Sequence, residues 1–307
     1  MKALLTSFLI CMATIAFAEG DWAKKADFPS SSRNFGLGFS IGKKGYFGMG
    51  QKQTKPFIYK SYNDFWEYDP ETDVWTQKAD FPGGGRLMAR GFSVNNKIYV
   101  GFGFVIAAYG SNAGGNDYQT DFYEFDPHSN KWAEKNEARL GRGDIFFVLK
   151  DKAYAVNLEY RSLNIYNAQT DTWFANTWGK KELAPNPADL AGYDVCFPSG
   201  EKEYLITTIR EKGETINQLW EFDPAAISWK KKNSLPIPGS DTVSVFSIGE
   251  KNFAIMGGTE VLEYDPETQN WNTKKGIAAE HEGFRPAFYS EKSVYGFRKY
   301  EFWEFEP

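Results

Sequence analysis

The stretch FWEYDPETDVW, which runs from Phe65 to Trp75, decides the fold because the chain repeats it. It returns with changes as FYEFDPHSNKW (122–132), LNIYNAQTDTW (163–173), LWEFDPAAISW (219–229) and VLEYDPETQNW (261–271). A sixth copy, FWEFEP (302–307), lacks the tryptophan that ends the others. One phrase that recurs every 41 to 57 residues indicates an architecture built from equivalent units that pack on one another.

The tryptophan that the sixth copy lacks stands near the other end of the chain. Trp22 begins the sequence WAKKADFP (22–29), which matches WTQKADFP at residues 75–82. One unit is therefore divided between the two termini. Pairing its two parts would close a ring and remove an exposed sheet edge, so we expect the segment after Gly20 to complete the last unit.

Each unit carries a second phrase upstream of the first, in which a lysine follows an aromatic residue by five positions and precedes another aromatic by two. It occurs as Phe39/Lys44/Tyr46, Phe92/Lys97/Tyr99, Phe147/Lys152/Tyr154, Phe197/Lys202/Tyr204 and Phe246/Lys251/Phe253. In the sixth unit we place Lys292 at the lysine position, with Ala287 and Val294 beside it. The intervening residues are typical of hairpin turns, and the flanking segments are typical of strands. Four strands in each of six units predict an all-β, six-bladed propeller over residues 19–307.

These phrases resemble the Kelch repeat over residues 20–307. The double glycine that usually ends the second Kelch strand remains only as Gly257-Gly258, and Phe297-Arg298 stands there in the sixth unit. The resemblance implies a fold similar to the propeller of galactose oxidase. We do not expect the copper chemistry of that enzyme, because the two histidines, His128 and His281, are predicted to lie on opposite faces. We expect no metal and no cofactor.

The first residues have the form of a secretory signal peptide. Lys2 precedes an apolar run that is too short to span a bilayer, and the small residues Ala16 and Ala18 flank a cleavage site. We expect residues 1–18 to be removed after Ala18, in preference to lipidation at Cys11, and the protein to be periplasmic or secreted. Cleavage leaves Cys196 without a partner for a disulfide. The net charge of −5 disfavours nucleic acid as a partner. We expect a monomer that does not insert into a membrane.

The spacing of the two phrases shows which connections vary. From the lysine to the turn residue the distance is 29 residues in the second unit (Lys97 to Asp126) but 14 in the fifth (Lys251 to Asp265). In a meander of four strands, this second-to-third connection emerges on the same face as the connections between blades. Binding residues often occupy such variable loops on a rigid scaffold. Aromatic candidates in these loops are Tyr59, Tyr109 and Trp178, and local packing at the blade edges is the alternative.

The same face receives the start of each inner strand, beside the central channel. Arginines stand at or near these starts: Arg33, Arg86, Arg90, Arg142 and Arg285. A ring of guanidinium groups would bind a carboxylate or phosphate through paired hydrogen bonds. The alternative is that arginines and aspartates neutralise one another across the channel.

Three functions follow from these features. The first is a binding module that engages a protein or glycan of the cell envelope through the face with long loops. The second is a carbohydrate isomerase that resembles the N-acetylneuraminate epimerases (sialic-acid mutarotases), with His281 and Glu282 as candidates for the catalytic groups. The third is a structural scaffold in a larger assembly. We rank the binding module first and expect it not to be an enzyme.

Overall fold

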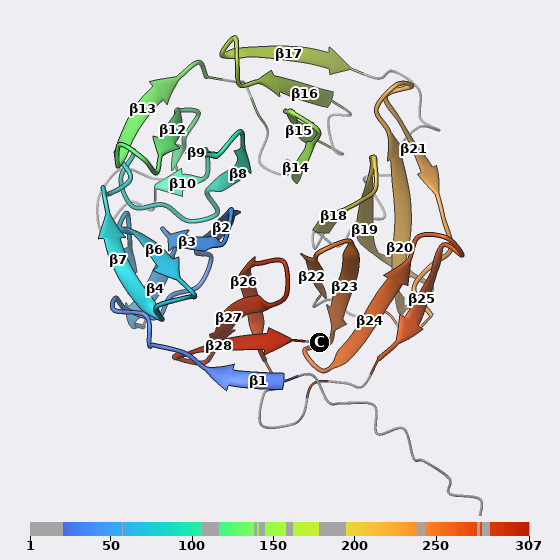
Figure 1. The fold of residues 1–307 in the computed structure, drawn as a ribbon. Coiled ribbons are helices and arrows are strands. Elements are labelled where there is room, and N and C mark those ends of the chain that lie inside the picture. The colour runs from blue at the N-terminus through green and yellow to red at the C-terminus, as the bar shows by residue number, and fades with distance from the viewer. Residues whose placement is uncertain are drawn as a thin grey trace, which may run out of the picture.

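The computed structural model describes residues 21–56, 58–105, 117–137, 140, 145–157, 162–177, 195–236, 239, 243–274, 277 and 283–306. These residues form six four-stranded antiparallel sheets, which are arranged as blades around a central axis (Figure 1), and two small two-stranded sheets. Strands are the only regular elements in this part of the chain. The predicted all-β, six-bladed propeller is confirmed.

In each blade the first strand lies nearest the axis and the fourth lies at the rim. Blade 1 consists of β2 (Leu37–Ile41), β3 (Lys44–Gly48), β6 (Phe65–Asp69) and β7 (Val74–Lys78). Blade 2 consists of β8 (Arg90–Val94), β9 (Lys97–Gly101), β12 (Phe122–Asp126) and β13 (Lys131–Lys135). Blade 3 consists of β14 (Ile145–Leu149), β15 (Lys152–Asn157), β16 (Ser162–Asn167) and β17 (Thr172–Thr177).

The second half of the ring repeats this order. Blade 4 consists of β18 (Val195–Ser199), β19 (Lys202–Glu211), β20 (Glu214–Asp223) and β21 (Ser228–Lys231). Blade 5 consists of β22 (Val243–Ile248), β23 (Lys251–Met256), β24 (Glu260–Asp265) and β25 (Asn270–Thr273). Blade 6 consists of β26 (Arg285–Tyr289), β27 (Val294–Arg298), β28 (Glu301–Glu306) and β1 (Asp21–Lys24). The inner strands contact one another in the order β2, β8, β14, β18, β22, β26 and back to β2, which makes the ring continuous.

Blade 6 is closed by the N-terminal strand, as the divided repeat predicts. β1 pairs antiparallel with β28, and Trp22 lies opposite Phe305. Their rings stack with centroids 4.4 Å apart. The backbone N–H of Lys25 then donates to the carbonyl of Phe302 at 3.0 Å. The pairing covers the edge of β28 that would otherwise be exposed.

The repeated tryptophans pack between blades. Trp75 of blade 1 is 8% exposed and lies with its ring centroid 5.0 Å from that of Phe302 in blade 6. Its indole N–H donates at 3.1 Å to the carbonyl of Ala26, in the segment that follows β1. Trp132 makes the equivalent bond to the carbonyl of Ala79 at 2.8 Å. The repeated indole therefore makes apolar contact between neighbouring blades, and in Trp75 and Trp132 it adds a hydrogen bond.

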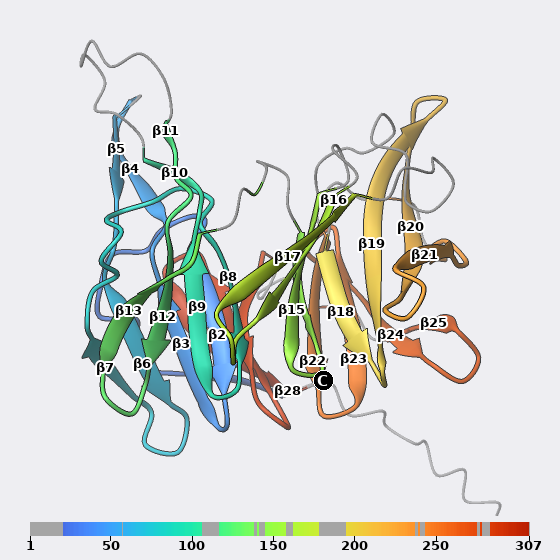
Figure 2. The same ribbon diagram turned by 90° about the horizontal axis from the view of Figure 1, so that it is seen from above.

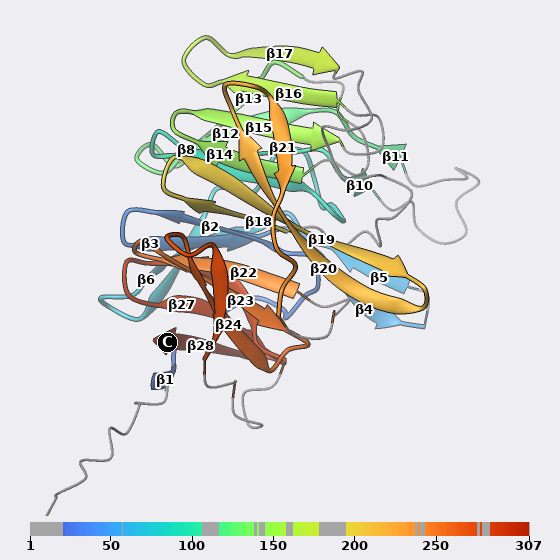
Figure 3. The ribbon, with the colours of Figure 1, turned by 90° about the vertical axis from the view of Figure 1, so that its right-hand side faces the viewer.

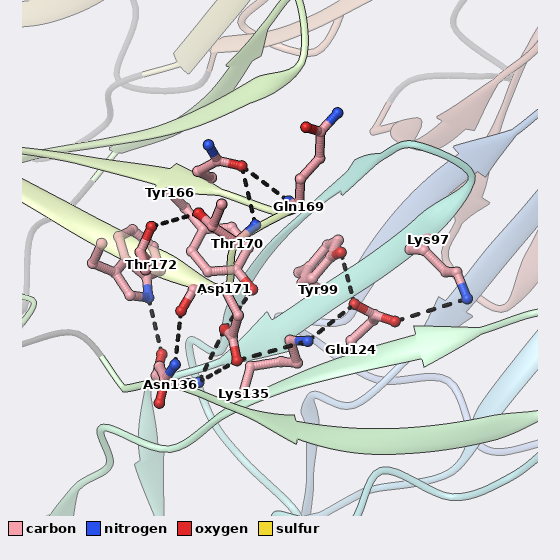
Figure 4. A network of polar contacts seen from close by, with 12 residues as sticks. Lys97, Tyr99, Glu124, Lys135, Asn136, Tyr166, Gln169, Thr170, Asp171 and Thr172 are labelled. Atoms are coloured by element: carbon pink, nitrogen blue, oxygen red, sulfur yellow. Dashed lines mark hydrogen bonds and ion pairs between the residues drawn. The ribbon is translucent and has the colours of Figure 1, made fainter.

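A polar cluster also recurs from blade to blade, and Figure 4 shows it in blade 2. Glu124 of the third strand accepts a hydrogen bond at 2.8 Å from the phenol of Tyr99. The ammonium groups of Lys97 and Lys135 lie 3.8 and 3.6 Å from its carboxylate oxygens. The carboxylate of Asp126, two residues further on, lies 2.8 Å from the ammonium nitrogen of Lys97. It also accepts a hydrogen bond from the backbone N–H of His128 at 2.8 Å. The lysine–glutamate pair of this cluster occurs in blades 1, 2, 4 and 5.

Our alignment of the sixth unit was wrong by one residue. Phe288 and Tyr295 pair across β26 and β27 as Phe39 and Tyr46 do in blade 1, so these two residues hold the aromatic positions. Ser293 therefore stands where the other units have lysine, and Lys292 belongs to the hairpin turn. The error arose because the lysine, rather than the pair of aromatic residues, was used to align this unit.

Three hairpins extend from one face, which we call the loop face. They are β4 (Gln51–Lys55) with β5 (Ile58–Ser61), β10 (Phe104–Val105) with β11 (Asp117–Tyr118), and the far ends of the long strands β19 and β20. Figures 2 and 3 show the β4–β5 and β19–β20 hairpins projecting on the same side of the ring. The second-to-third connections of blades 1, 2 and 4 therefore build this face, in agreement with the spacing of the repeats.

Candidate functional site

A cavity of about 790 Å³ opens on the loop face between blades 6 and 1. Blade 1 contributes residues 32–34 before β2 and residues 51–53 of β4, and blade 6 contributes Gly283, Arg285 and residues 297–300. We call this cavity the seam pocket, because it lies at the junction that ring closure creates. Five of its lining residues are basic and none of those described is acidic: Arg33, Lys52, Arg285, Arg298 and Lys299.

Arg285 is the predicted candidate that the structure places in the pocket with an accessible guanidinium group. It is the first residue of β26 and is exposed. Its Nη1 donates to the side-chain oxygen of Asn34 at 3.0 Å, across the seam. A smaller cavity of about 160 Å³ between blades 5 and 6 shares Arg285 and Gly283 with the seam pocket. Arg285 therefore stands on the wall between two cavities.

Gln51 is held rigidly at the floor of the seam pocket. Its backbone forms two hydrogen bonds with Asn34, at 2.8 and 2.9 Å. Gly50 permits this close approach, because it has φ +87° and a Cβ there would lie 2.6 Å from the carbonyl oxygen of Asn34. The Gln51 side chain is 7% exposed, and its Oε1 has no hydrogen-bond partner within the described part of the chain. A buried polar atom left in this way costs about 1–3 kcal/mol unless a ligand or water satisfies it.

Arg298 lines the pocket and carries a second unsatisfied atom. Its Nε is buried and has no acceptor among the described residues. Its Nη1 lies 3.9 Å from the carboxylate of Glu301, at the limit of an ion pair. The guanidinium group therefore keeps hydrogen-bonding capacity for an anion. Phe297 and the 76% exposed Tyr300 add aromatic surface beside it.

Arg33 and Arg86 have structural roles, because each forms an ion pair within its own blade. Arg33 forms an ion pair with Asp64, and its Nη2 lies 3.0 Å from that carboxylate. Burial acts to raise the pKa of Asp64, but hydrogen bonds from Arg33 and other donors hold this pKa below its ordinary value. Arg86, which is 1% exposed, pairs in the same way with Asp121. The alternative in which arginine and aspartate neutralise one another therefore describes both residues, although the pairs form within a blade and not across the channel.

The other predicted residues are dispersed. Arg90 begins β8 and is half-buried, and it does not line the seam pocket. Tyr59 is 44% exposed on the β4–β5 hairpin. Five candidates lie outside the described residues: Arg142, Tyr109, Trp178, His281 and Glu282. The ligand-binding and catalytic assignments of these residues stay predictions.

The sequence reasoning missed Gln51 and Arg298 as site residues. Arg298 carried a usable signal, because Phe297-Arg298 replaces the glycines that end the second strand in other units. Gln51 stands out only when it is compared with the residue at the corresponding position of blade 2. The bridge between Asn34 and Gln51 corresponds to one between Leu87 and Phe104, so a polar pair, of which Gln51 is buried, has replaced an apolar one.

Two features are absent from the described part of the chain. The part of the chain that the structure describes holds no group of three or more histidine, cysteine, aspartate or glutamate side chains arranged to bind a metal. It contains no helix long and apolar enough to cross a membrane. The seam pocket has basic and aromatic residues in its lining, and guanidinium groups of this kind can pair with anions.

Comparison with models of known protein families finds no match. Among curated proteins, the chain is 25% identical to N-acetylneuraminate epimerase 2 of an Escherichia coli O6:H1 strain, over 91% of this chain and 70% of the relative. It is 26% identical to N-acetylneuraminate epimerase of Escherichia coli O157:H7, over 84% of this chain and 62% of the relative. It is 25% identical to Kelch-like protein 35 of Mus musculus, over 66% of this chain but only 33% of the relative.

A solved structure, that of YjhT, superposes on the chain with a TM-score of 0.63. The superposition covers 92% of this chain and 95% of the other at 15% identity, so it establishes a common fold. Together with the repeated phrases and the observed blades, these similarities make the chain a Kelch-type six-bladed β-propeller.

Proposed function

We propose that this Kelch-type propeller is an exported binding module whose seam pocket takes an acidic carbohydrate. The observation that carries the proposal is the pocket itself, whose described lining has no acidic residue and, besides the paired Arg33, four basic residues: Lys52, Arg285, Arg298 and Lys299. Gln51 and Arg298 line the same cavity, and each has a buried side-chain atom, Oε1 and Nε, without a partner among the described residues.

The chemistry of an acidic sugar fits each part of the pocket. Its carboxylate would accept hydrogen bonds from Arg298 and Arg285, whose charge also offsets the loss of hydration. A hydroxyl group of the sugar would donate to Gln51. The face of the sugar ring would lie against Phe297 or Tyr300, since aromatic rings commonly stack on the C–H groups of a ring. A simple inorganic anion would satisfy Arg298 but not the Gln51 oxygen.

Titration calorimetry of the protein with N-acetylneuraminate, glucuronate and neutral galactose tests the proposal. We expect the two acids to bind and galactose to bind at least about tenfold more weakly, because it lacks the charge that the arginines pair with. Arg285→Ala and Gln51→Leu should weaken binding of the acids. Lys131→Ala, which removes an exposed charge from β13 in blade 2, is the matched control and should not. Equal binding of galactose, or equal loss in the control, would refute the proposal.

An epimerase is the second candidate. Two bacterial relatives are named for epimerisation of N-acetylneuraminate, and the match to one of them covers 91% of this chain. Within the sequence, His281 and Glu282 directly precede Gly283, which lines the seam pocket. Anomer exchange requires a group that transfers a proton near the sugar ring, and these two side chains have the right chemistry.

Proton NMR of freshly dissolved α-N-acetylneuraminate tests this second candidate. An epimerase would accelerate exchange to the β anomer, and the acceleration would fall in Glu282→Gln. A binding module would bind the sugar and leave the exchange rate unchanged. We expect the second result, since nothing favours catalysis over binding at this pocket.

We also propose that the chain is exported and that residues 1–18 are its signal peptide. The support is their sequence, with a basic residue, an apolar run and a small-residue cleavage site. Expression in a bacterium followed by cell fractionation and N-terminal sequencing is the test. We expect a periplasmic or secreted protein that begins at Glu19, and a cytoplasmic protein that keeps Met1 would contradict this.

A further inference from the structure

The recurring polar cluster places a lysine ammonium group at the same position in four of the blades. In blades 1, 2, 4 and 5, the lysine that begins the second strand approaches a glutamate of the third strand. The distances between the lysine Nζ and the carboxylate are 2.8 Å for Lys44 and Glu67, 3.8 Å for Lys97 and Glu124, 2.6 Å for Lys202 and Glu221, and 3.3 Å for Lys251 and Glu263. A second acidic residue, two positions after the glutamate, contacts the same ammonium group in blades 1 and 2: Asp69 and Asp126.

Blade 6 keeps the acidic side of this cluster and lacks the lysine. Glu304 holds the glutamate position, where it accepts a hydrogen bond from the phenol of Tyr295. The ammonium nitrogen of Lys25 lies 3.3 Å from the Glu304 carboxylate, as that of Lys135 lies beside Glu124 in blade 2. Glu306 holds the position of Asp69 and Asp126. The inner lysine, however, is replaced by Ser293, which is 2% exposed.

A cavity of about 270 Å³ lies at this place, on the face opposite the loop face. Its lining includes Ser293, Tyr295, Glu304 and Glu306, which are the blade 6 counterparts of Lys44, Tyr46, Glu67 and Asp69. The cavity therefore lies beside the position at which the sister blades carry their partly exposed lysine. Pro70 of blade 1 adds an apolar wall.

The charges around the cavity favour a cation. Burial acts to raise the pKa of Glu304, but hydrogen bonds from Tyr295 and Ser293 and the charge of Lys25 hold this pKa below its ordinary value, so the group is ionised at neutral pH. Glu306 accepts a hydrogen bond from the Ser293 hydroxyl at 3.2 Å and forms no ion pair with any described residue. Of the two lysines in the lining, Lys43 is engaged by Glu71 at 2.7 Å, and Lys292 is exposed in the hairpin turn.

We propose that this cavity, which we call the blade 6 cavity, binds the primary ammonium group of a small aliphatic amine. The ammonium nitrogen takes the position of the missing lysine Nζ, between Glu304 and Glu306, and the alkyl chain lies along Tyr295. The sister blades supply an independent argument for this ligand, because the same two acidic positions bind an ammonium group on an alkyl chain there. The site lies on the opposite face from the seam pocket, so it does not depend on the proposed carbohydrate function.

Butylammonium is the probe that matches the missing side chain in length. We would titrate it into the protein by calorimetry at constant ionic strength, beside tetramethylammonium and sodium as cations that lack N–H donors. We expect one equivalent of butylammonium to bind, and tetramethylammonium and sodium to bind at least about tenfold more weakly, because N–H donors to carboxylates supply much of the affinity. Absence of butylammonium binding, or equal affinity for the two control cations, would overturn the proposal.

Two substitutions locate the site. Ser293→Lys restores the residue of the sister blades, so it should abolish butylammonium binding and raise the melting temperature of the protein without ligand. Lys44→Ser makes the matching cavity in blade 1, so it should lower the melting temperature and add a second equivalent of binding. Unchanged binding in Ser293→Lys would overturn the proposal, and so would a single equivalent in a folded Lys44→Ser protein.

Discussion

Replacing Glu221 with glutamine should lower stability by an amount that depends on pH. The Glu221 side chain is 9% exposed and accepts hydrogen bonds from Lys202 at 2.6 Å and from Tyr204 at 3.1 Å, and Lys232 lies 2.8 Å away. Burial acts to raise the pKa of Glu221, but these donors lower it from the ordinary value of 4.5 to about 2. That difference of about 2.5 in pKa corresponds to about 3 kcal/mol of folding free energy at neutral pH.

The direction of the pH effect follows from the lowered pKa. Above the unfolded-state pKa near 4.5 the native carboxylate contributes its full stabilisation, and this is lost as the pH falls toward the native pKa of about 2. Glutamine cannot ionise. The difference in stability between the wild-type protein and Glu221→Gln should therefore be about 3 kcal/mol at pH 7 and should shrink progressively between about pH 4.5 and pH 2.

Urea unfolding followed by tryptophan fluorescence at pH 7, 5, 4 and 3 measures this difference. Urea is preferred to a guanidinium salt because it does not screen the lysine charges. Glu214→Gln is the matched control, since Glu214 is an exposed residue at the start of the same strand, and it should change stability by less than about 0.5 kcal/mol at every pH. A difference for Glu221→Gln that stays constant from pH 7 to pH 3 would refute the reasoning.

Three further predictions concern the scaffold. Trp75→Ala should cost about 3–5 kcal/mol in urea unfolding, because the indole is buried between blades 1 and 6, and an unchanged midpoint would contradict this. Deleting residues 19–27 removes β1 and exposes the edge of β28, so the melting temperature should fall and light scattering should show association. Glu203→Gln should stabilise the protein at pH 7 but not near pH 4. Glu203 is 2% exposed with an unpaired Oε2, and burial raises its pKa well above the ordinary value, so the wild-type protein loses stability as the pH rises above about 4.5. Equal unfolding free energies of the wild-type protein and Glu203→Gln at pH 7 would contradict this last prediction.

The fold was predictable because the same contacts recur in every unit. The indole of Trp75 and the pairing of Trp22 with Phe305 depend on residues that the repeats display directly. Alignment failed only in blade 6, where the lysine is absent and a neighbouring lysine stands one position away. The register of β26 on β27, which pairs Phe288 with Tyr295, corrects it.

The candidate site was predictable only in part. Arg33 and Arg285 look alike in the sequence, since both stand near the start of an inner strand. Their roles differ because Asp64 lies beside Arg33, a contact between residues 31 positions apart that spacing alone does not reveal. Gln51 looked like an ordinary residue of an exposed loop. Its burial follows from the bridge to Asn34, which only the folded chain displays.

Both proposed ligand sites lie at the junction of blades 6 and 1, and this location has a physical consequence. Each cavity takes part of its lining from blade 6 and part from blade 1. The segment that follows β1 joins these two blades, and Trp75 is bonded to it at Ala26. A ligand that contacts both walls binds only when the blades are docked, so binding and ring closure stabilise one another through linkage. An acidic sugar that contacts both walls of the seam pocket should therefore raise the melting temperature of the intact protein, and loosening of β1 should weaken its binding.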